Sequence, residues 1–474
     1  MFSATKNTKD AKIKSLFAYA LVFCAVAAHA ALPDNGGYSI SGVTAVSLQP
    51  WDRRVIVNFT VTPPSGAPAD GILRLEVVAS NGVDRVYVSD ASVYGGNYCT
   101  ASGPQTLVWD PTVDHAGIAF SDVTFHIAVA ETNVTSLPYL SVHLADGKIG
   151  YHSMAITNRI TNERFLKDYM VFRRIPATTS DEWKAISGGK DTFTFGAVSN
   201  DCAHFYKNGS DFIKEQLREV KLTHDFYMAV YPVTIGQLES LGFKQRQNWS
   251  NDRRWNDTYG AGYNAATMGL TYDFIRGSDT TSQYNFPATS DVAPDSLVGV
   301  LRARTGLNFD LPTEAQWEYA CKAGSTNAYW FTATDELPAL ETLTNRVKNA
   351  YVTRFPPNAW GLYAMVGCCH QWTTTLGRTT DNANLNAWNN NNLVVFDEGA
   401  VDPVGPVPSY SNPYRIVRGS HFNADVNSTQ TMWDGVARKI VFRVYRTGYR
   451  YPQKTNISAS EKQLLGARLC LTLP

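Results

Sequence analysis

The feature that most limits the possible folds lies between residues 38 and 131, where turn residues separate short apolar segments. Within each segment apolar and polar side chains alternate, and β-branched residues are frequent. A period of two residues predicts strands with one buried face, and no helical pattern interrupts them. We therefore expect an antiparallel β-sandwich over residues 38–131. The five segments are residues 55–61, 73–78, 86–88, 105–109 and 123–129.

This region is similar to fibronectin type III and immunoglobulin modules, although it lacks the Cys…Trp…Cys pattern of true immunoglobulin domains. Modules of this kind usually act as spacers or adhesive units, and no chemistry is visible in this one. Residues 132–164, which follow, are polar and carry mixed patterns. We expect them to connect two domains, the second of which covers residues 165–474.

Residues 1–30 are typical of an export signal peptide. Four lysines in the first fourteen residues precede an apolar stretch over residues 16–28. The small residues Ala28 and Ala30 predict cleavage before Ala31, which leaves the mature protein secreted, periplasmic or at the cell surface. The alternative, an uncleaved anchor, is disfavoured because a bilayer-spanning helix needs about 20 apolar residues. No later segment is long and apolar enough, so no transmembrane segment is expected.

Charge and composition narrow the range of partners. The formal net charge is +0, and no run rich in Lys or Arg follows the first fifteen residues. Nucleic-acid binding requires a basic patch, so no nucleic-acid partner is expected. Aromatic residues form 12% of the chain, which suits either packing in a loop-rich fold or a surface that binds carbohydrate or peptide. Packing is the favoured interpretation, and the ligand is left open between protein and carbohydrate.

Six cysteines remain once the signal peptide is removed. An oxidising compartment permits disulfides, but the spacing of these residues gives no disulfide framework. Cys321 in an apolar helix face and Cys470 in a terminal strand are expected to pack as small hydrophobic residues. The neighbours Cys368 and Cys369 could bridge only with strained geometry, so no bond is assumed there. The six residues are Cys99, Cys202, Cys321, Cys368, Cys369 and Cys470.

Beyond residue 165 the strands become short, the loops long, and few helices are credible. The clearest helix begins at Thr313, which forms the pattern of a capping box with Gln316. Trp317 and Cys321 share the apolar face of this helix. Loops of such length are uncommon in a compact domain unless they are functional or braced.

The same helix carries two carboxylates, Glu314 and Glu318, at a spacing that places them on one face. Such a pair could act as a catalytic acid and base. Charged residues at this spacing more often form a solvated helix face, and we favour that interpretation.

Six segments of the second half match, in order, the landmarks of one family. Together they resemble the formylglycine-generating enzyme, or sulfatase-modifying factor, family, and the match covers about two-thirds of the chain. The resemblance implies an α+β fold of the C-type-lectin-like class, rich in long loops. It does not settle the activity, because the superfamily also includes sulfoxide synthases and members of unknown role. The segments are residues 193–196 (FTFG), 220–234 (VKLTHDFYMAVYPVT), 311–320 (LPTEAQWEYA), 358–367 (NAWGLYAMVG), 416–419 (IVRG) and 465–469 (LGARL).

The resemblance also implies where catalytic groups would stand. Enzymes of this family bind copper(I) through two cysteines, and those positions fall on Ala424 and Thr429 here. No cysteine occurs between Cys369 and Cys470, so a shifted alignment cannot restore the pair. The sequence therefore argues against copper(I), which soft thiolate ligands select.

Other candidate site residues are identified by position alone. His421 and Asp425 follow the Arg-Gly-Ser segment, and His370 could join them if the fold brings it near. One imidazole and one carboxylate are too few for an iron facial triad, so a hydrogen-bonding role for His421 is favoured. Arg446 and Arg450 match a family segment in which arginines brace the floor of a cleft and its loops.

The family's calcium segment is altered as well. The resemblance places Cys368 and Gln371 where Asn and Glu help to bind calcium. Calcium prefers hard oxygen ligands, so this site is expected to be empty or weak. A cluster of Cys368, Cys369 and His370 could attract zinc, but three consecutive residues do not easily face one ion. Burial of these side chains is the favoured alternative.

These observations favour an exported protein with a sulfatase-modifying-factor-like domain that has a non-catalytic binding or structural role, in effect a pseudoenzyme. The first alternative is an oxidoreductase of the formylglycine-generating type that acts on sulfatases. The second is an enzyme that uses a different metal. The sequence leaves enzymatic activity open between these three hypotheses.

Overall fold

The chain forms two compact units, Met1–Val134 and Thr135–Pro474, in a computed structural model. Each unit is described by itself below. The expected signal peptide lies outside the described residues. No helix among the described residues is long and apolar enough to cross a membrane. The structure describes residues 35–47, 54–67, 72–90, 92–93, 96–114, 123–132, 134, 137–152, 154–158, 160–196, 217–243, 262–277, 292–327, 351–377, 396–405, 414–420, 429–431, 437–439, 450–455 and 464–473.

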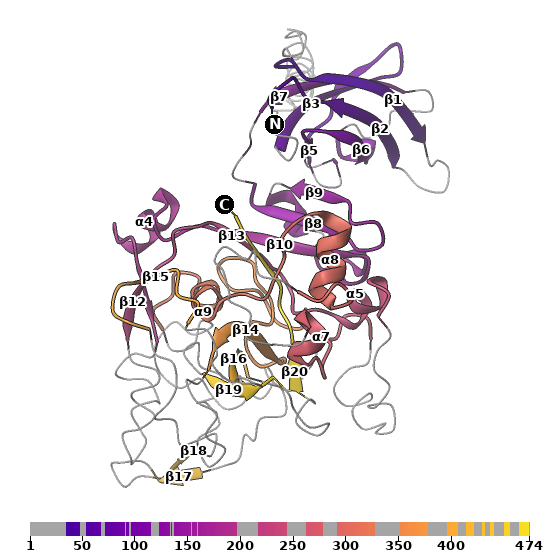
Figure 1. Ribbon diagram of the computed structural model, residues 1–474. Coiled ribbons are helices and arrows are strands. Elements are labelled where there is room, and N and C mark those ends of the chain that lie inside the picture. The colour runs from indigo at the N-terminus through magenta and orange to yellow at the C-terminus, as the bar shows by residue number, and fades with distance from the viewer. Residues whose placement is uncertain are drawn as a thin grey trace, which may run out of the picture. The chain divides into compact units, whose positions relative to one another are not determined.

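The first unit contains two antiparallel sheets (Figure 1). One has the strand order β1-β2-β6, and in the other β4, β5 and β7 all pair with β3. A short helix, α2 (Pro111–Asp114), follows β6. The strands are β1 (Ser39–Ser47), β2 (Val55–Thr62), β3 (Ile72–Ser80), β4 (Arg85–Tyr87), β5 (Tyr98–Thr100), β6 (Gly103–Trp109) and β7 (Thr124–Glu131).

Both sheets of this unit contribute to one apolar core. Alternate residues of β2, among them Val57 and Phe59, are buried, as are those of β3, so the predicted alternation is confirmed. The ring of Trp109 from β6 meets that of Phe125 from β7 edge to face, with centroids 5.6 Å apart. All five predicted strands are present. Two further strands were not predicted: β1, whose side chains are mostly exposed, and the three-residue β5.

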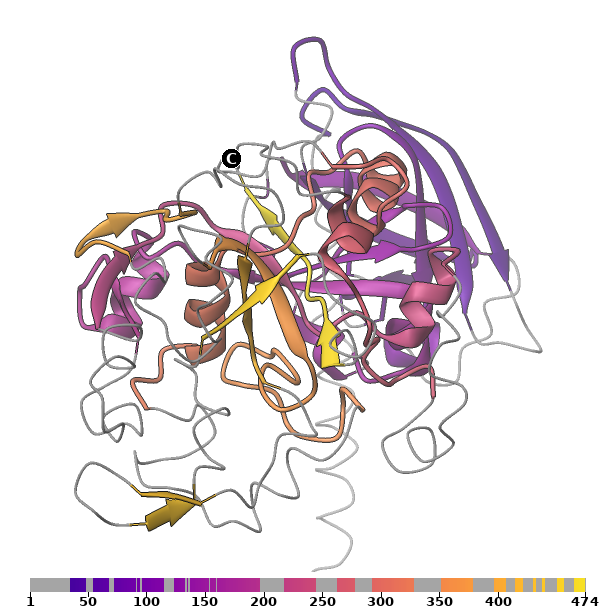
Figure 2. The ribbon, with the colours of Figure 1, turned by 60° about the horizontal axis from the view of Figure 1, so that its bottom comes forward.

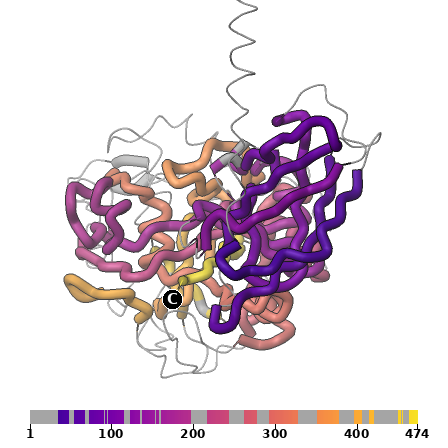
Figure 3. The backbone as a smooth tube through the Cα atoms, turned by 90° about the horizontal axis from the view of Figure 1, so that it is seen from above, coloured from indigo at the N-terminus to yellow at the C-terminus, as the bar shows by residue number. Residues whose placement is uncertain are grey.

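The second unit is mixed α/β, with many strands and few helices. Its largest sheet has the order β21-β13-β10-β8-β9, and all four strand pairs are antiparallel. The yellow C-terminal strand β21 returns to the magenta strands of this sheet (Figure 3). These strands are β8 (Tyr139–His143), β9 (Ile149–His152), β10 (Tyr169–Ile175), β13 (Phe226–Ala229) and β21 (Cys470–Thr472).

The connector expected over residues 132–164 differs from the structure, because β8 and β9 lie within that range and belong to the main sheet. A 3-10 helix, η1 (Met154–Asn158), follows them. The polar residues that suggested a loop are buried as a pair: Ser141 Oγ lies 2.6 Å from His152 Nε2. This contact satisfies Ser141 Oγ and His152 Nε2, which helps the two residues to occupy buried strand positions that usually hold apolar residues.

Six helices of the second unit begin at a side chain that caps the first turn. The capping box predicted at Thr313 and Gln316 is confirmed, and Thr234 forms a second one with Gln237. Such caps satisfy backbone N–H groups that the helix itself leaves unpaired. The helices are α3 (Glu163–Lys167), α4 (Asp181–Ser187), α5 (Ile235–Ser240), α7 (Tyr272–Arg276), α8 (Leu297–Thr305) and α9 (Glu314–Lys322).

Smaller sheets complete the second unit, and two of them contact α9 (Figure 2). The order of one is β19-β16-β14-β20, in which β14 and β20 are parallel. Another has the order β11-β12-β15, and β17 pairs with β18. The strands are β11 (Phe193–Phe195), β12 (Arg218–Lys221), β14 (His370–Leu376), β15 (Ala400–Val401), β16 (Tyr414–Arg418), β17 (Thr429–Thr431), β18 (Ala437–Lys439), β19 (Tyr451–Lys454) and β20 (Leu465–Gly466).

Candidate functional site

Helix α9 places the side chains of Glu314 and Glu318 in the interior of the second unit. Its first turn is fixed by Thr313, and the backbone N–H of Glu314 also donates to Thr375 Oγ1 on β14 at 2.9 Å. Both glutamates are 0% exposed. The expectation of a solvated helix face is therefore wrong. The expectation fails because cations from distant segments of the chain reach both carboxylates. Helix spacing alone does not reveal these cations.

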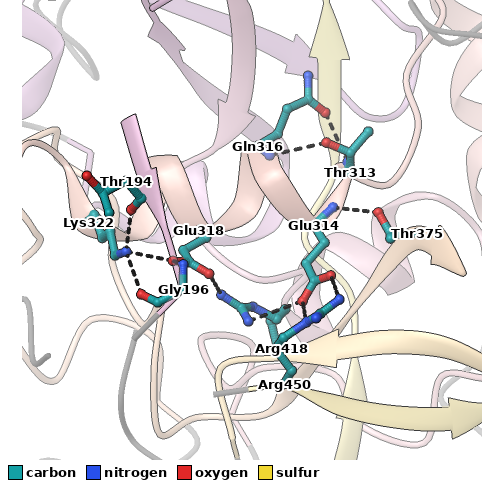
Figure 4. Close-up of polar contacts among 10 residues, drawn as sticks. All are labelled: Thr194, Gly196, Thr313, Glu314, Gln316, Glu318, Lys322, Thr375, Arg418 and Arg450. Atoms are coloured by element: carbon teal, nitrogen blue, oxygen red, sulfur yellow. Dashed lines mark hydrogen bonds and ion pairs between the residues drawn. The ribbon is translucent and has the colours of Figure 1, made fainter. Parts of the chain in front are cut away.

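Glu314 is bound by two arginines (Figure 4). Arg450 donates from Nε to Oε1 and from Nη2 to Oε2, each at 2.6 Å, in a bidentate pair. Arg418 Nη1 donates to Glu314 Oε1 at 3.2 Å. Charge-assisted bidentate pairs are among the strongest hydrogen bonds in proteins. The structure therefore places Arg450, a candidate identified from the sequence, in a buried ion pair with Glu314.

Glu318 joins the same network from the next turn of α9. Its carboxylate accepts from Arg418 Nη2, from Lys322 Nζ at 2.6 Å and from the backbone N–H of Gly196 at 2.7 Å. Lys322 Nζ also donates to the carbonyl oxygens of Thr194 at 2.7 Å and Gly196 at 3.0 Å. Burial alone would raise the pKa of Glu318, but the charges of Lys322 and Arg418 and these hydrogen bonds lower it. Glu318 is therefore ionised at neutral pH.

The network joins α9 to three other elements. In the pairing of β16 with β19, Val417 stands opposite Tyr451, which places Arg418 and Arg450 at neighbouring ends of the two strands. The guanidinium of Arg418 lies 5.1 Å from the centroid of the Trp317 ring. Both carboxylates face cations, and neither is exposed to a substrate. The arrangement is suited to holding elements together, and it offers no free carboxylic acid or base.

Gln371, a candidate calcium ligand, has a different role in the structure. Its Oε1 accepts hydrogen bonds from Trp317 Nε1 and from Arg468 Nε, both at 2.9 Å. Its Nε2 donates to the carbonyl oxygens of Ala364 and Met365, each at 3.1 Å. A cation at Oε1 would meet the guanidinium of Arg468. The residues around Gln371 therefore do not fit a calcium ion.

Arg468 is a further buried charge, and the sequence identified it only as part of a family motif. It is 0% exposed, and its guanidinium donates to the carbonyl oxygens of Ala229 at 2.6 Å, Val230 at 2.9 Å and Tyr363 at 2.5 Å. Burial lowers the pKa of Arg468 to about 10. Since that value stays well above neutral pH, the arginine remains charged, and through these carbonyl groups it binds together two segments that precede it in the chain.

The candidates Cys368 and His370 are packed against other side chains. Cys368 and Cys369 are buried free thiols in an apolar cluster, as expected from the sequence. A hydrogen bond with Cys369, together with burial, raises the pKa of Cys368, and burial raises that of Cys321 to about 12. Burial thus disfavours the thiolate form in which cysteine binds copper(I) or zinc. The ring of His370 stacks on that of Tyr451, with centroids 5.8 Å apart.

The remaining candidates, His421, Asp425 and Arg446, lie outside the described residues. Ala424 lies there as well, whereas Thr429, the other position that matches a copper cysteine, begins β17. Within the described part of the chain, no three His, Cys, Asp or Glu side chains converge as a metal site would require.

Comparisons with known proteins place this geometry in context. A family model described as "Sulfatase-modifying factor enzyme 1-like domain" matches residues 171–451. A formylglycine-generating enzyme of Mycobacterium tuberculosis is 26% identical over 161 residues, which cover 31% of this chain and 47% of that protein. A formylglycine-generating enzyme of Bos taurus is 35% identical over 79 residues, or 14% of this chain and 21% of that protein. This chain thus spans less than half the length of either relative. No solved structure matches it.

Proposed function

Because the chain belongs to the sulfatase-modifying factor enzyme 1-like family, we propose that it is an exported binding or structural protein built on the scaffold of that family without its oxidase chemistry. This proposal rests on the structural role of residues 311–320, the helix motif of the family. The two carboxylates of this motif form buried ion pairs with Arg418, Arg450 and Lys322. The motif thus stabilises the fold and leaves no reactive group free.

The missing thiols support the same proposal. Copper(I) needs two thiolates, and no cysteine lies between Cys369 and Cys470. At the altered calcium segment, Gln371 fills its hydrogen-bonding capacity with protein partners. Two changed sites fit a scaffold retained for another purpose better than an enzyme with one unusual substitution.

The architecture suits recognition of a ligand. We propose that the second unit has a C-type-lectin-like fold, in which long loops form a binding surface over a fixed core. We propose that the first unit is a fibronectin-III-like or immunoglobulin-like module, since its two antiparallel sheets share one apolar core. The ligand would be a protein or a carbohydrate, with no nucleic-acid partner, and arrays of glycans and peptides would test for saturable binding.

The competing function is an oxidoreductase that converts a sulfatase cysteine to formylglycine. The names of the two relatives favour it, and it requires a centre that replaces the cysteine pair. The chain from Ala31 onward would be incubated with copper, oxygen and a Cys-x-Pro-x-Arg peptide, with a known formylglycine-generating enzyme as positive control. We expect no product. Formylglycine in the mass spectrum would overturn the proposed binding role.

An enzyme with a different metal is the third hypothesis. Metal analysis of the purified chain distinguishes it from the other two. Iron or zinc at one ion per chain would favour this hypothesis, and loss of that metal from a His421→Ala variant would assign the site.

A further inference from the structure

Two neighbouring cysteines lie together in the interior of the second unit. Cys368 and Cys369 are 3% and 0% exposed, and neither forms a disulfide in the structure. Their thiol groups are hydrogen-bonded to each other, and the backbone N–H of Ala266 donates to the sulfur of Cys368. The two sulfur atoms are therefore in contact without a covalent bond between them.

The sulfur of Cys369 fills space that a side chain at position 466 would need. A Cβ added to Gly466 would lie 2.6 Å from Cys369 Sγ and 2.8 Å from the carbonyl oxygen of Thr267. Gly466 in β20 pairs with Gln371 in β14, which begins directly after Cys369. Cys369 Sγ thus packs against the backbone of β20 where β14 and β20 meet.

A buried guanidinium lies beside the two thiols. Arg468 donates to three backbone carbonyl oxygens and to Gln371 Oε1, which are all neutral. Among the described residues no carboxylate pairs with it, and its charge interacts with the thiols of Cys369, Cys321 and Cys368. A positive charge next to a thiol favours the thiolate, which is the nucleophilic form. The same charge repels a metal cation, so the surroundings favour redox chemistry over metal binding.

The spacing of neighbouring residues determines what kind of bond Cys368 and Cys369 can form. Their Cα atoms lie about 3.8 Å apart across a trans peptide, whereas disulfides usually join Cα atoms about 4.4–6.8 Å apart. A bond between them closes almost no loop, so it lacks the stabilisation that a long-range crosslink provides. Strained disulfides are easily reduced again. A bond here would therefore be reversible, and it would not act as a permanent crosslink.

We propose that Cys368 and Cys369 are a redox modification site, which a low-molecular-weight disulfide converts to a reversible vicinal disulfide. The thiolate of Cys369, next to Arg468, attacks one sulfur of the small disulfide and releases one thiolate. Cys368 then loses its proton and attacks Cys369 Sγ, which releases the second thiolate. The cysteines lose two electrons, the small disulfide gains them, and the two protons pass to the released thiolates. The site lies outside the proposed function and does not depend on it.

Oxidised glutathione is the probe for this site. The whole chain from Ala31 onward would be incubated in mixtures of oxidised and reduced glutathione, quenched with acid, alkylated and digested. In excess oxidised glutathione we expect the peptide with both cysteines to carry no alkyl group and to be lighter by two hydrogen atoms. Excess reduced glutathione should restore the doubly alkylated peptide. A pair that stays alkylated throughout overturns the inference, and so does a bond from either cysteine to Cys202.

Other cysteines of the second unit provide the controls. Cys321 and Cys470 are also buried, and we expect both to remain alkylated in every mixture. If they were oxidised at the same rate as the pair, the unfolded chain would be the reacting species and the inference would be wrong. A Cys368→Ser variant should stop at a mixed disulfide between Cys369 and one glutathione, because the second thiol is absent. Failure of Cys369 to take up glutathione in this variant contradicts the first step.

The melting temperature tests whether the bond is strained. Formation of the bond draws Cys369 Sγ toward Cys368 and away from Gly466, so the contact of β14 with β20 should weaken. We expect the oxidised chain to melt about 2–4 °C below the reduced chain. Cys368→Ser should show no such difference between the two mixtures. Cys321→Ser is the matched control, because it removes another buried thiol that interacts with Arg468 and should keep the difference. A melting temperature that oxidation leaves unchanged or raises overturns the inference.

Discussion

The interiors of the two units are built from different chemistry. In the first unit, alternate residues of β2 and β3 bury apolar side chains, and Trp109 packs against Phe125. In the second unit, aromatic rings surround buried ions: Glu314 and Glu318 pair with arginines, and Arg468 binds three carbonyl oxygens. An apolar core depends mainly on volume, whereas a charged interior depends on each partner being present.

The largest expected effect comes from neutralising one charge without changing its shape. Glu314→Gln should destabilise the second unit by about 3–5 kcal/mol, because it leaves two buried guanidinium groups short of a counter-charge. Leu75→Met, a change of similar volume in the first unit, should cost less than about 1.5 kcal/mol. Urea unfolding followed by hydrogen-exchange mass spectrometry separates peptides of β16 from those of β3. If Glu314→Gln and Leu75→Met lowered the free energy of unfolding of their units equally, the comparison would be contradicted.

A second test compares two glycines with the same backbone conformation. Gly419 has a φ of +86°, and an added Cβ would lie 2.5 Å from the carbonyl oxygen of Met365. Gly82 has a φ of +88°, but an added Cβ there would meet nothing within 4 Å. We expect Gly419→Ala to cost about 3 kcal/mol, from strain and overpacking together. Gly82→Ala should cost about 1–2 kcal/mol, from the backbone alone.

The same unfolding measurement gives both values. A loss for Gly419→Ala no larger than that for Gly82→Ala would mean that the second unit relaxes around the added methyl group. Its interior would then be less rigid than the close approach of Gly419 to Met365 implies.

The smallest effect concerns pH. The folded pKa of Glu318 is lowered, so its contribution to stability is complete above the unfolded value of about 4.3 and is lost as pH falls through the folded value. Each pH unit of lowering contributes about 1.4 kcal/mol. As pH falls from neutral to below the folded pKa of Glu318, the free energy of unfolding of the second unit should decrease. The Glu318→Gln variant should show a smaller decrease over the same pH interval. A slope unchanged in that variant would assign the acid sensitivity to other groups.

Local features of the sequence were sufficient to predict part of the fold. Alternation over residues 55–61 predicts β2 because neighbouring residues alone decide which face is buried. The capping box at Thr313 predicts the start of α9 in the same way, since its partner Gln316 lies three residues away. The resemblance to the family was identified from six ordered segments, and the family match over residues 171–451 contains all of them except residues 465–469.

The charged interior could not be predicted, because its partners lie far apart in the sequence. Glu318 and Arg418 are separated by 100 residues, and Glu314 and Arg450 by 136. Helix spacing shows that the two glutamates share a face, but it does not show what covers that face. The pair of Ser141 and His152 was missed for a related reason: each polar residue alone suggests a loop, and only their contact permits burial.

The position of β21 bears on how the protein is made. Phe226 in β13 pairs with Thr472, so the main sheet gains an edge strand from a segment that is synthesised long after β13. Synthesis at about 5–20 residues per second leaves β8, β10 and β13 exposed for many seconds before that strand arrives. During this interval β13 presents an open edge to other nascent chains. A chaperone that covers this edge would therefore raise the yield of folded protein more than one that acts after release.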